Sequence, residues 1–195
     1  MLQALLSFFA IIDPVGNILV FHLYSQAFDP RQRLLAASIA VSASFTMLLA
    51  FSLGGEDALD YLGISEESFR VAAGLLLLPP AYRLVMQGQP DEIESSHSRK
   101  PMDFALVPLA TPLIAGPGAL AATTSFTAQV GTGNTLAAIA IILAITFVSF
   151  ATAGIIFRLA GEALLRLMSR IVGIVLFAIA VDFVLDGVRV VLETS

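Results

Sequence analysis

Long apolar runs, each of membrane-spanning length, alternate with short polar or Gly/Pro-containing segments along the whole chain. A helix rises about 1.5 Å per residue and the hydrocarbon core of a bilayer is about 30 Å thick, so about 20 apolar residues predict one spanning helix. We therefore predict an all-α membrane protein with six transmembrane helices. The predicted spans are about residues 2–28, 34–53, 69–87, 104–127, 135–158 and 171–192.

The first apolar run is interrupted halfway by Asp13-Pro14-Val15-Gly16-Asn17. Asp-Pro is typical of a helix start, with Asp as N-cap and Pro at the first helical position. We therefore expect two half-helices that meet at Asp13. Irregular backbone inside a membrane persists only where it is buried in protein or lines a wet cavity, and an ionisable residue at that depth predicts a functional site.

The fourth apolar run has a similar interruption at residues 111–118, Thr-Pro-Leu-Ile-Ala-Gly-Pro-Gly. Thr111-Pro112 predicts an N-cap followed by a first-turn proline. Interrupted hydrophobic segments at corresponding positions of two halves are a sequence-level indication of a transporter binding site. We therefore expect helices 1 and 4 to be broken in the middle of the membrane.

The two halves of the chain share spacings close to 99 residues. Pro14 lies 98 residues before Pro112, and the glycine pairs 74/173 and 88/187 are each 99 residues apart. These spacings predict a first three-helix repeat at 1–100, including a polar loop at 88–100, and a second at 101–195. Because each half has an odd number of spans, the halves have opposite orientations, which predicts a 3+3 inverted repeat.

Composition agrees with a membrane protein and excludes several other classes. The chain is 57% hydrophobic and 13% charged, with a mean hydropathy of +0.90, whereas soluble domains are about one-quarter charged. The apolar runs are too continuous for the alternating strands of a β-barrel. The absence of cysteine excludes disulfides and thiolate metal sites. The N-terminus lacks a basic region, so no cleavable signal peptide is expected.

The distribution of positive charge predicts the orientation. Eight of the ten Lys and Arg residues lie in or beside the loops after spans 1, 3 and 5. The positive-inside rule then places these loops in the cytoplasm and both termini outside, in a prokaryotic inner membrane. The eight residues are Arg31, Arg33, Arg83, Arg99, Lys100, Arg158, Arg166 and Arg170.

Two readings of Asp13 remain open and compatible: a proton or cation site at the membrane midplane, or a helix N-cap. Asn17 contacts a substrate or ties the break to the other half of the protein. Gly16 belongs to the same candidate site. The segment Gly116-Pro117-Gly118 exposes backbone N–H and C=O groups for a ligand, or its glycines only allow close packing.

Opposed half-helix N-termini suit a zwitterion, because a helix N-terminus attracts a carboxylate while Asp13 or exposed carbonyls receive the ammonium group. Thr111 offers a hydroxyl to such a site. Asp182, near the middle of span 6, is a candidate for cation coupling, with pairing to Arg189 or Arg83 as the alternative.

The sequence contains no G-x-S-x-G, H-E-x-x-H or P-loop motif, so we expect no enzyme activity, cofactor, metal or nucleic-acid partner. The expected partners are a small-molecule substrate, a coupling cation and the lipid bilayer. Small-residue faces on spans 2 and 5 permit a homo-oligomer, although the same faces are needed inside the monomer.

With Phe9-x-x-x-Asp-Pro-Val-Gly-Asn and Pro108-Leu-Ala-Thr-Pro-Leu-Ile-Ala-Gly-Pro-Gly118 in view, the chain resembles the MarC family of bacterial and archaeal inner-membrane proteins. The resemblance covers essentially the whole chain. It implies six spans, termini outside, and a substrate site around Asp13, Asn17 and residues 116–118. Some members are described as cation-coupled transporters of neutral amino acids such as alanine and glycine. The family pattern implies an uncharged polar residue near Asp182, so that carboxylate is a departure.

We therefore expect a secondary transporter of small neutral amino acids, coupled to H⁺ or Na⁺. The alternatives are a channel or exporter for another small solute, or a membrane scaffold without transport. An intramembrane enzyme is the remaining class.

Overall fold

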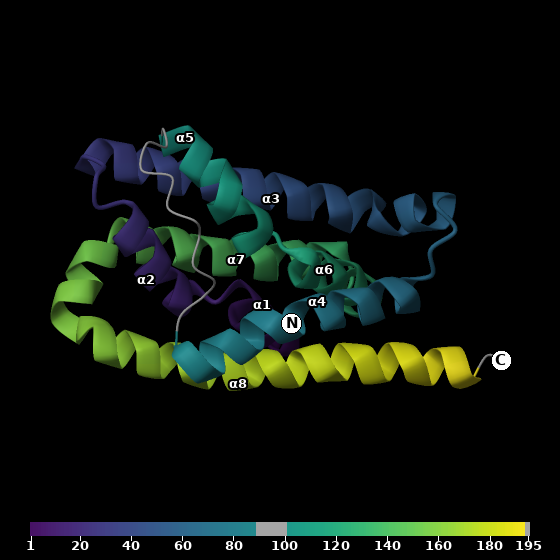
Figure 1. Ribbon diagram of the computed structural model, residues 1–195. Coiled ribbons are helices and arrows are strands. Elements are labelled where there is room, and N and C mark those ends of the chain that lie inside the picture. Colours follow the sequence, from purple (N-terminus) through teal and green to yellow (C-terminus); the bar gives the residue numbers. More distant parts are fainter. Residues whose placement is uncertain (89–100, 194–195) are drawn as a thin grey trace.

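A computed structural model describes residues 1–88 and 101–193, and every regular element in these ranges is helical (Figure 1). The predicted polar loop therefore lies, apart from Gly88, outside the described residues. The elements are α1 (Leu2–Ile12), α2 (Pro14–Tyr24), α3 (Pro30–Tyr61), α4 (Glu66–Gln87), α5 (Pro101–Phe104), the π-helix η1 (Ala105–Ile114), α6 (Pro117–Val130), α7 (Thr132–Ala151) and α8 (Ala153–Glu193).

The broken elements form the interior of the molecule. Figure 1 shows α3 and α8 along opposite sides, with α1, α2 and α6 between them. In the apolar window of Leu2–Tyr24, 72% of the residues are buried, against 28% for α3 and 22% for α8. The helix that contains the Asp13 break is thus the most buried of the long apolar helices, and the unbroken helices surround it.

α3 extends beyond its predicted bounds of 34–53 at both ends, and a cap at Asp29 fixes its start. Asp29 Oδ1 accepts a hydrogen bond from the Gln32 N–H (2.8 Å), and Gln32 Oε1 accepts one from the Asp29 N–H (3.0 Å), which forms a capping box. The predicted end of this helix at 53, before Gly54-Gly55, was wrong, because α3 continues to Tyr61. Gly55 lies against the Phe51 ring and a methyl group on α6, and this close packing explains why glycine is kept inside the helix.

The fifth and sixth predicted spans also have different bounds. α7 ends at Ala151 rather than at 158. Residues 153–160 form the first part of α8, and Gly161 (φ 73°, ψ 162°) separates them from the long part of that helix. Residues 162–170, which lie between the fifth and sixth predicted spans, are therefore helical, and glycine at 161 tolerates the positive φ at the kink.

Five helices among the described residues are long and apolar enough to cross a membrane. They correspond to predicted spans 1, 2, 3, 5 and 6. The predicted fourth span, 104–127, is divided into η1 with 10 residues and α6 with 14, each shorter than a span. The outer faces of the long helices carry exposed apolar side chains, including Leu53, Leu75, Ile174, Leu185 and Leu192.

Glycines bring α4 and α8 into close contact. A Cβ atom at Gly74 of α4 would lie 2.7 Å from the Ala180 carbonyl oxygen of α8. A Cβ atom at Gly173 of α8 would lie 2.7 Å from the Leu84 Cβ of α4. Contacts below about 3.0 Å have no room for a side chain, so glycine at both positions allows the two backbones to approach each other.

The ends of the same interface repeat this arrangement. A Cβ at Gly88, just after α4, would lie 2.8 Å from the Arg166 carbonyl oxygen of α8. A Cβ at Gly187 of α8 would lie 2.8 Å from the Glu67 carbonyl oxygen of α4. α8 thus contributes two glycines to this interface, α4 contributes one, and the residue that caps the end of α4 is the fourth.

Candidate functional site

Asp13 forms the junction between α1 and α2. Its backbone is in the left-handed conformation (φ 46°, ψ 67°), which L-residues seldom adopt, although Asp and Asn tolerate it better than most. Its Oδ1 atom accepts a hydrogen bond from the Gly16 N–H at 2.9 Å. The prediction that Asp13 caps a second half-helix is confirmed.

The other carboxylate oxygen of Asp13 has a different environment. Oδ2 is buried and has no hydrogen-bond partner among the described residues, and the residue as a whole is 5% exposed. Leaving a carboxylate oxygen buried without a partner is costly, so such an atom is a candidate for binding a cation or a proton. Gly16 makes room for it, because a Cβ there would lie 2.1 Å from Oδ2.

Asn17 fastens the two half-helices together. Its Nδ2 atom donates a hydrogen bond to the Ile12 carbonyl at 2.7 Å, and the residue is 2% exposed. Ile12 ends α1, where carbonyl groups have no partner within the helix, so this bond satisfies an otherwise orphaned acceptor. This bond lies within the first break and does not join it to the other half of the chain, and substrate contact by Asn17 stays a prediction.

The second break lies within the predicted segment 111–118. α6 begins at Pro117 with Gly116 as N-cap, near the end of that segment. Thr111 lies within η1 with extended backbone angles (φ −138°, ψ 126°), and its hydroxyl donates to Met47 Sδ at 3.3 Å. Gly116-Pro117 and Thr111-Pro112 share one sequence pattern, in which a candidate N-cap residue precedes a proline, and α6 begins at the second of them along the chain, Gly116-Pro117.

Both breaks line one cavity of about 380 Å³. Gly16 and Thr111 are not among its lining residues. The first break contributes Ile11, Ile12, Asp13 and Asn17, and the second contributes Leu113, Ile114, Gly116, Pro117, Gly118 and Ala119. Four of the six predicted substrate-site residues, Asp13, Asn17, Gly116 and Gly118, therefore meet at one place.

The N-terminus of α6 brings backbone donors to this cavity. Gly116 has no side chain to cap the helix, and Pro117 has no N–H group. The first intrahelical hydrogen bond runs from the Leu120 N–H to the Gly116 carbonyl (3.1 Å), so the N–H groups of Gly118 and Ala119 precede it. Both residues line the cavity, where these groups and the positive end of the helix dipole favour an anion.

α4 contributes a feature that the sequence reasoning did not assign to the site. Pro79 and Pro80 line the cavity, and α4 stays helical through both. A proline has no N–H group, so the carbonyls four residues earlier, those of Leu75 and Leu76, lose their helical donors. Leu76 also lines the cavity. A Pro-Pro pair within an apolar span was the sequence signal for carbonyls that lack their usual helical donors.

The structure does not bring Asp182 to the cavity. Asp182 is exposed on α8, and the α8 residue that lines the cavity is Leu176. The coupling role predicted for Asp182 thus has no support from the geometry around Asp13. When a helix is apolar on all sides, its sequence does not show which side faces the interior of the protein. The sequence therefore did not show that Asp182 lies on the exposed side of α8.

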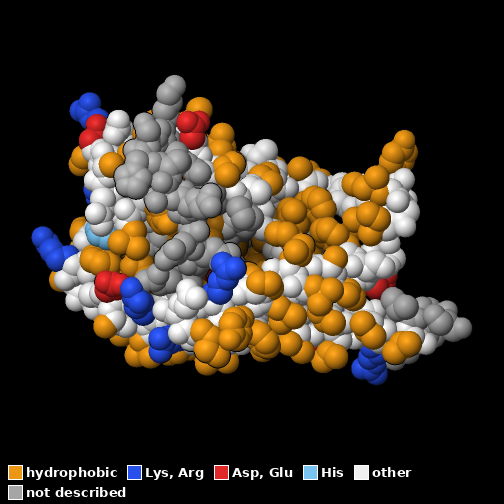
Figure 2. Space-filling view, viewed as in Figure 1, with side chains coloured by type: hydrophobic (Ala, Val, Ile, Leu, Met, Phe, Trp, Pro, Cys, Tyr) orange, Lys and Arg blue, Asp and Glu red, His pale blue; other side chains and the backbone are white. Residues whose placement is uncertain are grey.

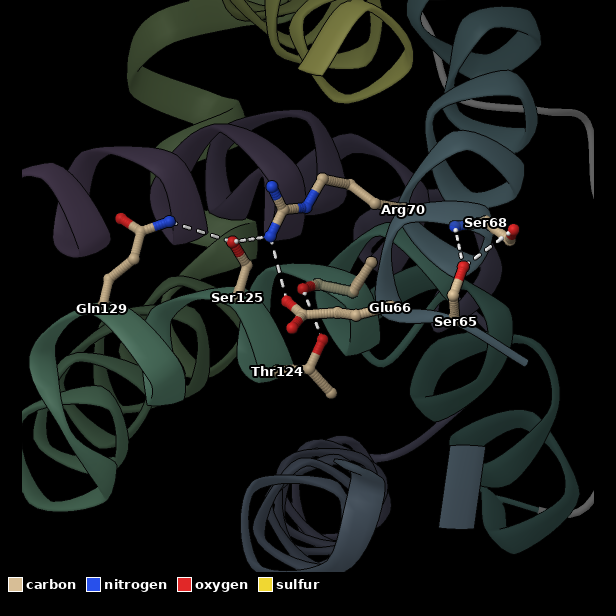
Figure 3. Close-up of polar contacts among 8 residues, drawn as sticks. Ser65, Glu66, Ser68, Arg70, Thr124, Ser125 and Gln129 are labelled. Atoms are coloured by element: carbon tan, nitrogen blue, oxygen red, sulfur yellow. Dashed lines mark hydrogen bonds and ion pairs between the residues drawn. The ribbon is translucent and has the colours of Figure 1, made fainter. Parts of the chain in front are cut away.

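A polar network joins α4 to α6 away from the cavity (Figure 3). Arg70 Nη2 donates to Glu66 Oε1 (2.9 Å) on its own helix and to Ser125 Oγ (2.9 Å) on α6. Gln129 Nε2 donates to the same hydroxyl oxygen (3.0 Å). Figure 3 shows the Arg70 side chain reaching across to α6, so this contact fixes the two helices that flank the cavity.

The known proteins that are similar to this chain are described as membrane proteins. A UPF0056 membrane protein of Methanocaldococcus jannaschii is 34% identical over 193 residues, which cover 94% of this chain and 93% of that protein. UPF0056 membrane proteins of Aquifex aeolicus (33% identical, 98% and 93% covered) and Bacillus subtilis (29% identical, 94% and 92% covered) are also similar. No solved structure matches the chain.

The family described as MarC family integral membrane proteins matches residues 1–192, nearly the full length. The match includes both helix breaks and all the helices that line the cavity. The predicted family is therefore confirmed, and the chain belongs to the MarC family of integral membrane proteins.

Proposed function

We propose that this protein is a secondary transporter of small neutral amino acids of the alanine and glycine type, coupled to H⁺ or Na⁺. The observation that carries the proposal is the single cavity between two helix breaks, lined by Asp13, Asn17, Gly116 and Gly118. Secondary transporters typically bind substrate and coupling ion at discontinuous helices near the bilayer midplane.

The chemistry of the cavity suits a zwitterion. The N–H groups at the start of α6 offer hydrogen-bond donors and a positive dipole end to a carboxylate. The unpartnered Oδ2 atom of Asp13 and the carbonyl freed by Pro80 offer acceptors to an ammonium group or a metal cation. A short apolar side chain would then contact Leu77 and Leu176, which also line the cavity.

Alternating access between two inverted repeats is part of this proposal. The paired contacts of α4 and α8 support it, because the contacting glycines of the two segments are 99 positions apart. Gly74 corresponds to Gly173 and Gly88 to Gly187. Their partners correspond too, since Glu67 and Arg166 are 99 residues apart. In such transporters one repeat rocks against the other around a fixed site.

We further propose that the protein lies in a prokaryotic inner membrane with both termini outside. The relatives come from bacteria and archaea, which supports the setting. The excess of Lys and Arg in the loops after predicted spans 1, 3 and 5 supports the orientation.

Uptake of labelled alanine and glycine into proteoliposomes, with and without a pH or sodium gradient, tests the proposal. We expect saturable, gradient-driven uptake that Asp13→Asn lowers by about tenfold or more, because an amide does not provide the charge that a cation requires. Asparagine is as good an N-cap as aspartate, so the variant is expected to fold.

Asp182→Asn is the matched control, since it removes a carboxylate on the exposed side of α8. Equal losses in both variants would contradict a site at Asp13. Absence of flux from folded wild-type protein would exclude the amino-acid assignment. Flux without saturation or gradient dependence would indicate a channel instead.

A further inference from the structure

A second cavity, of about 410 Å³, lies apart from the one between the helix breaks. It is surrounded by helix ends: the end of α2, the start of α3, the end of α7 and the start of α8. Its polar lining residues are His22 and Ser25 from the end of α2, Arg33 near the start of α3, and Arg158 in the first part of α8.

The position of this cavity is at one end of the long helices. α3 starts at Pro30 and α7 ends at Ala151, and both residues line it. The ends of membrane-spanning helices lie at the level of the lipid headgroups, because the spans match the hydrocarbon thickness. Most of the arginine side chains visible in Figure 2 (blue) also lie toward the end where α3 begins.

The lining has an excess of groups that carry or accept positive charge. Two arginines and one histidine line the cavity, and none of its lining residues is acidic. The nearby carboxylates have other contacts: Asp29 accepts from the Gln32 N–H, and Glu162 pairs with Arg166. A negatively charged ligand would thus meet no opposing carboxylate among the lining residues.

Arg33 is fixed in place while part of its guanidinium stays available. Nε donates to the Phe28 carbonyl (3.0 Å) and Nη2 to the Gln26 carbonyl (3.2 Å). A guanidinium has five N–H donors in a planar fork, so three remain after these two bonds. An oriented guanidinium with free donors matches the geometry of phosphate oxygens.

His22 offers a further polar group. Its ring stacks on Phe157 with a centroid distance of 4.2 Å, which holds the ring against α8. Its Nδ1 atom is buried and has no hydrogen-bond partner among the described residues. A buried ring nitrogen without a partner requires a water or a ligand atom to satisfy it.

We propose that this cavity binds the phosphate group of an anionic phospholipid. The remaining lining favours a lipid over a free anion, because Phe21, Leu34, Phe150 and Ile155 are apolar, and Leu34 and Ile155 are about half exposed. Basic pockets between transmembrane helices at a membrane surface bind lipid headgroups by this combination of charge and apolar surface.

Native mass spectrometry of the detergent-purified protein, with phosphatidylglycerol or phosphatidylcholine added, tests the proposal. We expect preferential retention of phosphatidylglycerol, and Arg158→Gln should weaken that retention about fivefold. Arg31→Gln is the matched control, because Arg31 is another exposed arginine beside the start of α3 but does not line the cavity. It should change retention less than about twofold.

Equal effects of the two variants, or equal retention of the two lipids, would overturn the proposal. A second experiment adds inorganic phosphate at constant ionic strength and measures the midpoint temperature of thermal unfolding. If phosphate raises the midpoint of the wild-type protein but not of Arg158→Gln, while neither lipid is preferred, that result would assign the cavity to a free anion and overturn the lipid assignment. Displacement of bound phosphatidylglycerol by phosphate would support the proposed phosphate contact.

Discussion

At the residue scale, the two carboxylate oxygens of Asp13 have different surroundings. Oδ1 accepts the Gly16 N–H and caps α2, while Oδ2 is buried without a partner. Gly16 makes this arrangement possible, because its missing Cβ leaves the space that Oδ2 occupies. Capping and a candidate cation site thus coexist in one side chain, as the sequence had left open.

Gly16→Ala is expected to lower the free energy of unfolding by about 1–3 kcal/mol, since the new methyl group would overlap the Asp13 carboxylate. Gly54→Ala is the control, because a Cβ at Gly54 meets no atom within 4 Å. That change should be neutral or stabilise by about 0.5–1 kcal/mol, since alanine is the better helix former. Denaturant unfolding in detergent measures both, and a Gly16→Ala variant as stable as wild type would contradict this packing.

At the element scale, the helices beside the cavity are held by two kinds of contact. Glycines allow α4 and α8 to approach at Gly74 and Gly173, where side chains have no room. Hydrogen bonds join α4 to α6 at Arg70 and Ser125. Close backbone contact and buried polar bonds are the interactions that hold helices together in lipid, where apolar burial between helices provides little.

Ser125→Ala is expected to lower the unfolding free energy by about 1.5–3 kcal/mol, because it removes the acceptor on α6 for the charged Arg70 guanidinium. Ser38→Ala removes a hydroxyl that only bonds the Leu34 carbonyl of its own helix, so it should have an effect below about 0.5 kcal/mol. Thermal unfolding of the two variants in the same detergent compares them. Similar losses in both would indicate that the contact between α4 and α6 contributes little.

At the scale of the whole molecule, the proposed orientation places the start of α3 in the cytoplasm and its end outside. The chain contains no cysteine, so single cysteines give unambiguous labelling sites. Tyr61→Cys, at a residue that is 93% exposed, should react with a membrane-impermeant maleimide added to intact cells. Arg31→Cys should react only after the cells are permeabilised. The reverse pattern would place both termini in the cytoplasm.

Much of the fold follows from local rules that act within a few residues. Apolar runs give the helices, and the caps at Asp13, Asp29 and Ser65 mark where α2, α3 and α4 begin. These features are legible in the sequence because a capping side chain bonds to backbone groups two or three positions away. The ends of α3 and α7 were misplaced, since the helix end depends on what packs against it.

The sequence by itself determined the membrane class, the family, the position of the first break and four residues that line the cavity, Asp13, Asn17, Gly116 and Gly118. Only the tertiary structure decided that α6 begins at Pro117, that Asp182 lies outside the cavity, and that Pro79 and Pro80 belong to it. The physical reason is that a short sequence pattern, such as a cap or a proline, determines only which nearby backbone groups lack hydrogen-bond partners. Which helices meet, and which face of an apolar helix is buried, depends on contacts between residues far apart in the chain.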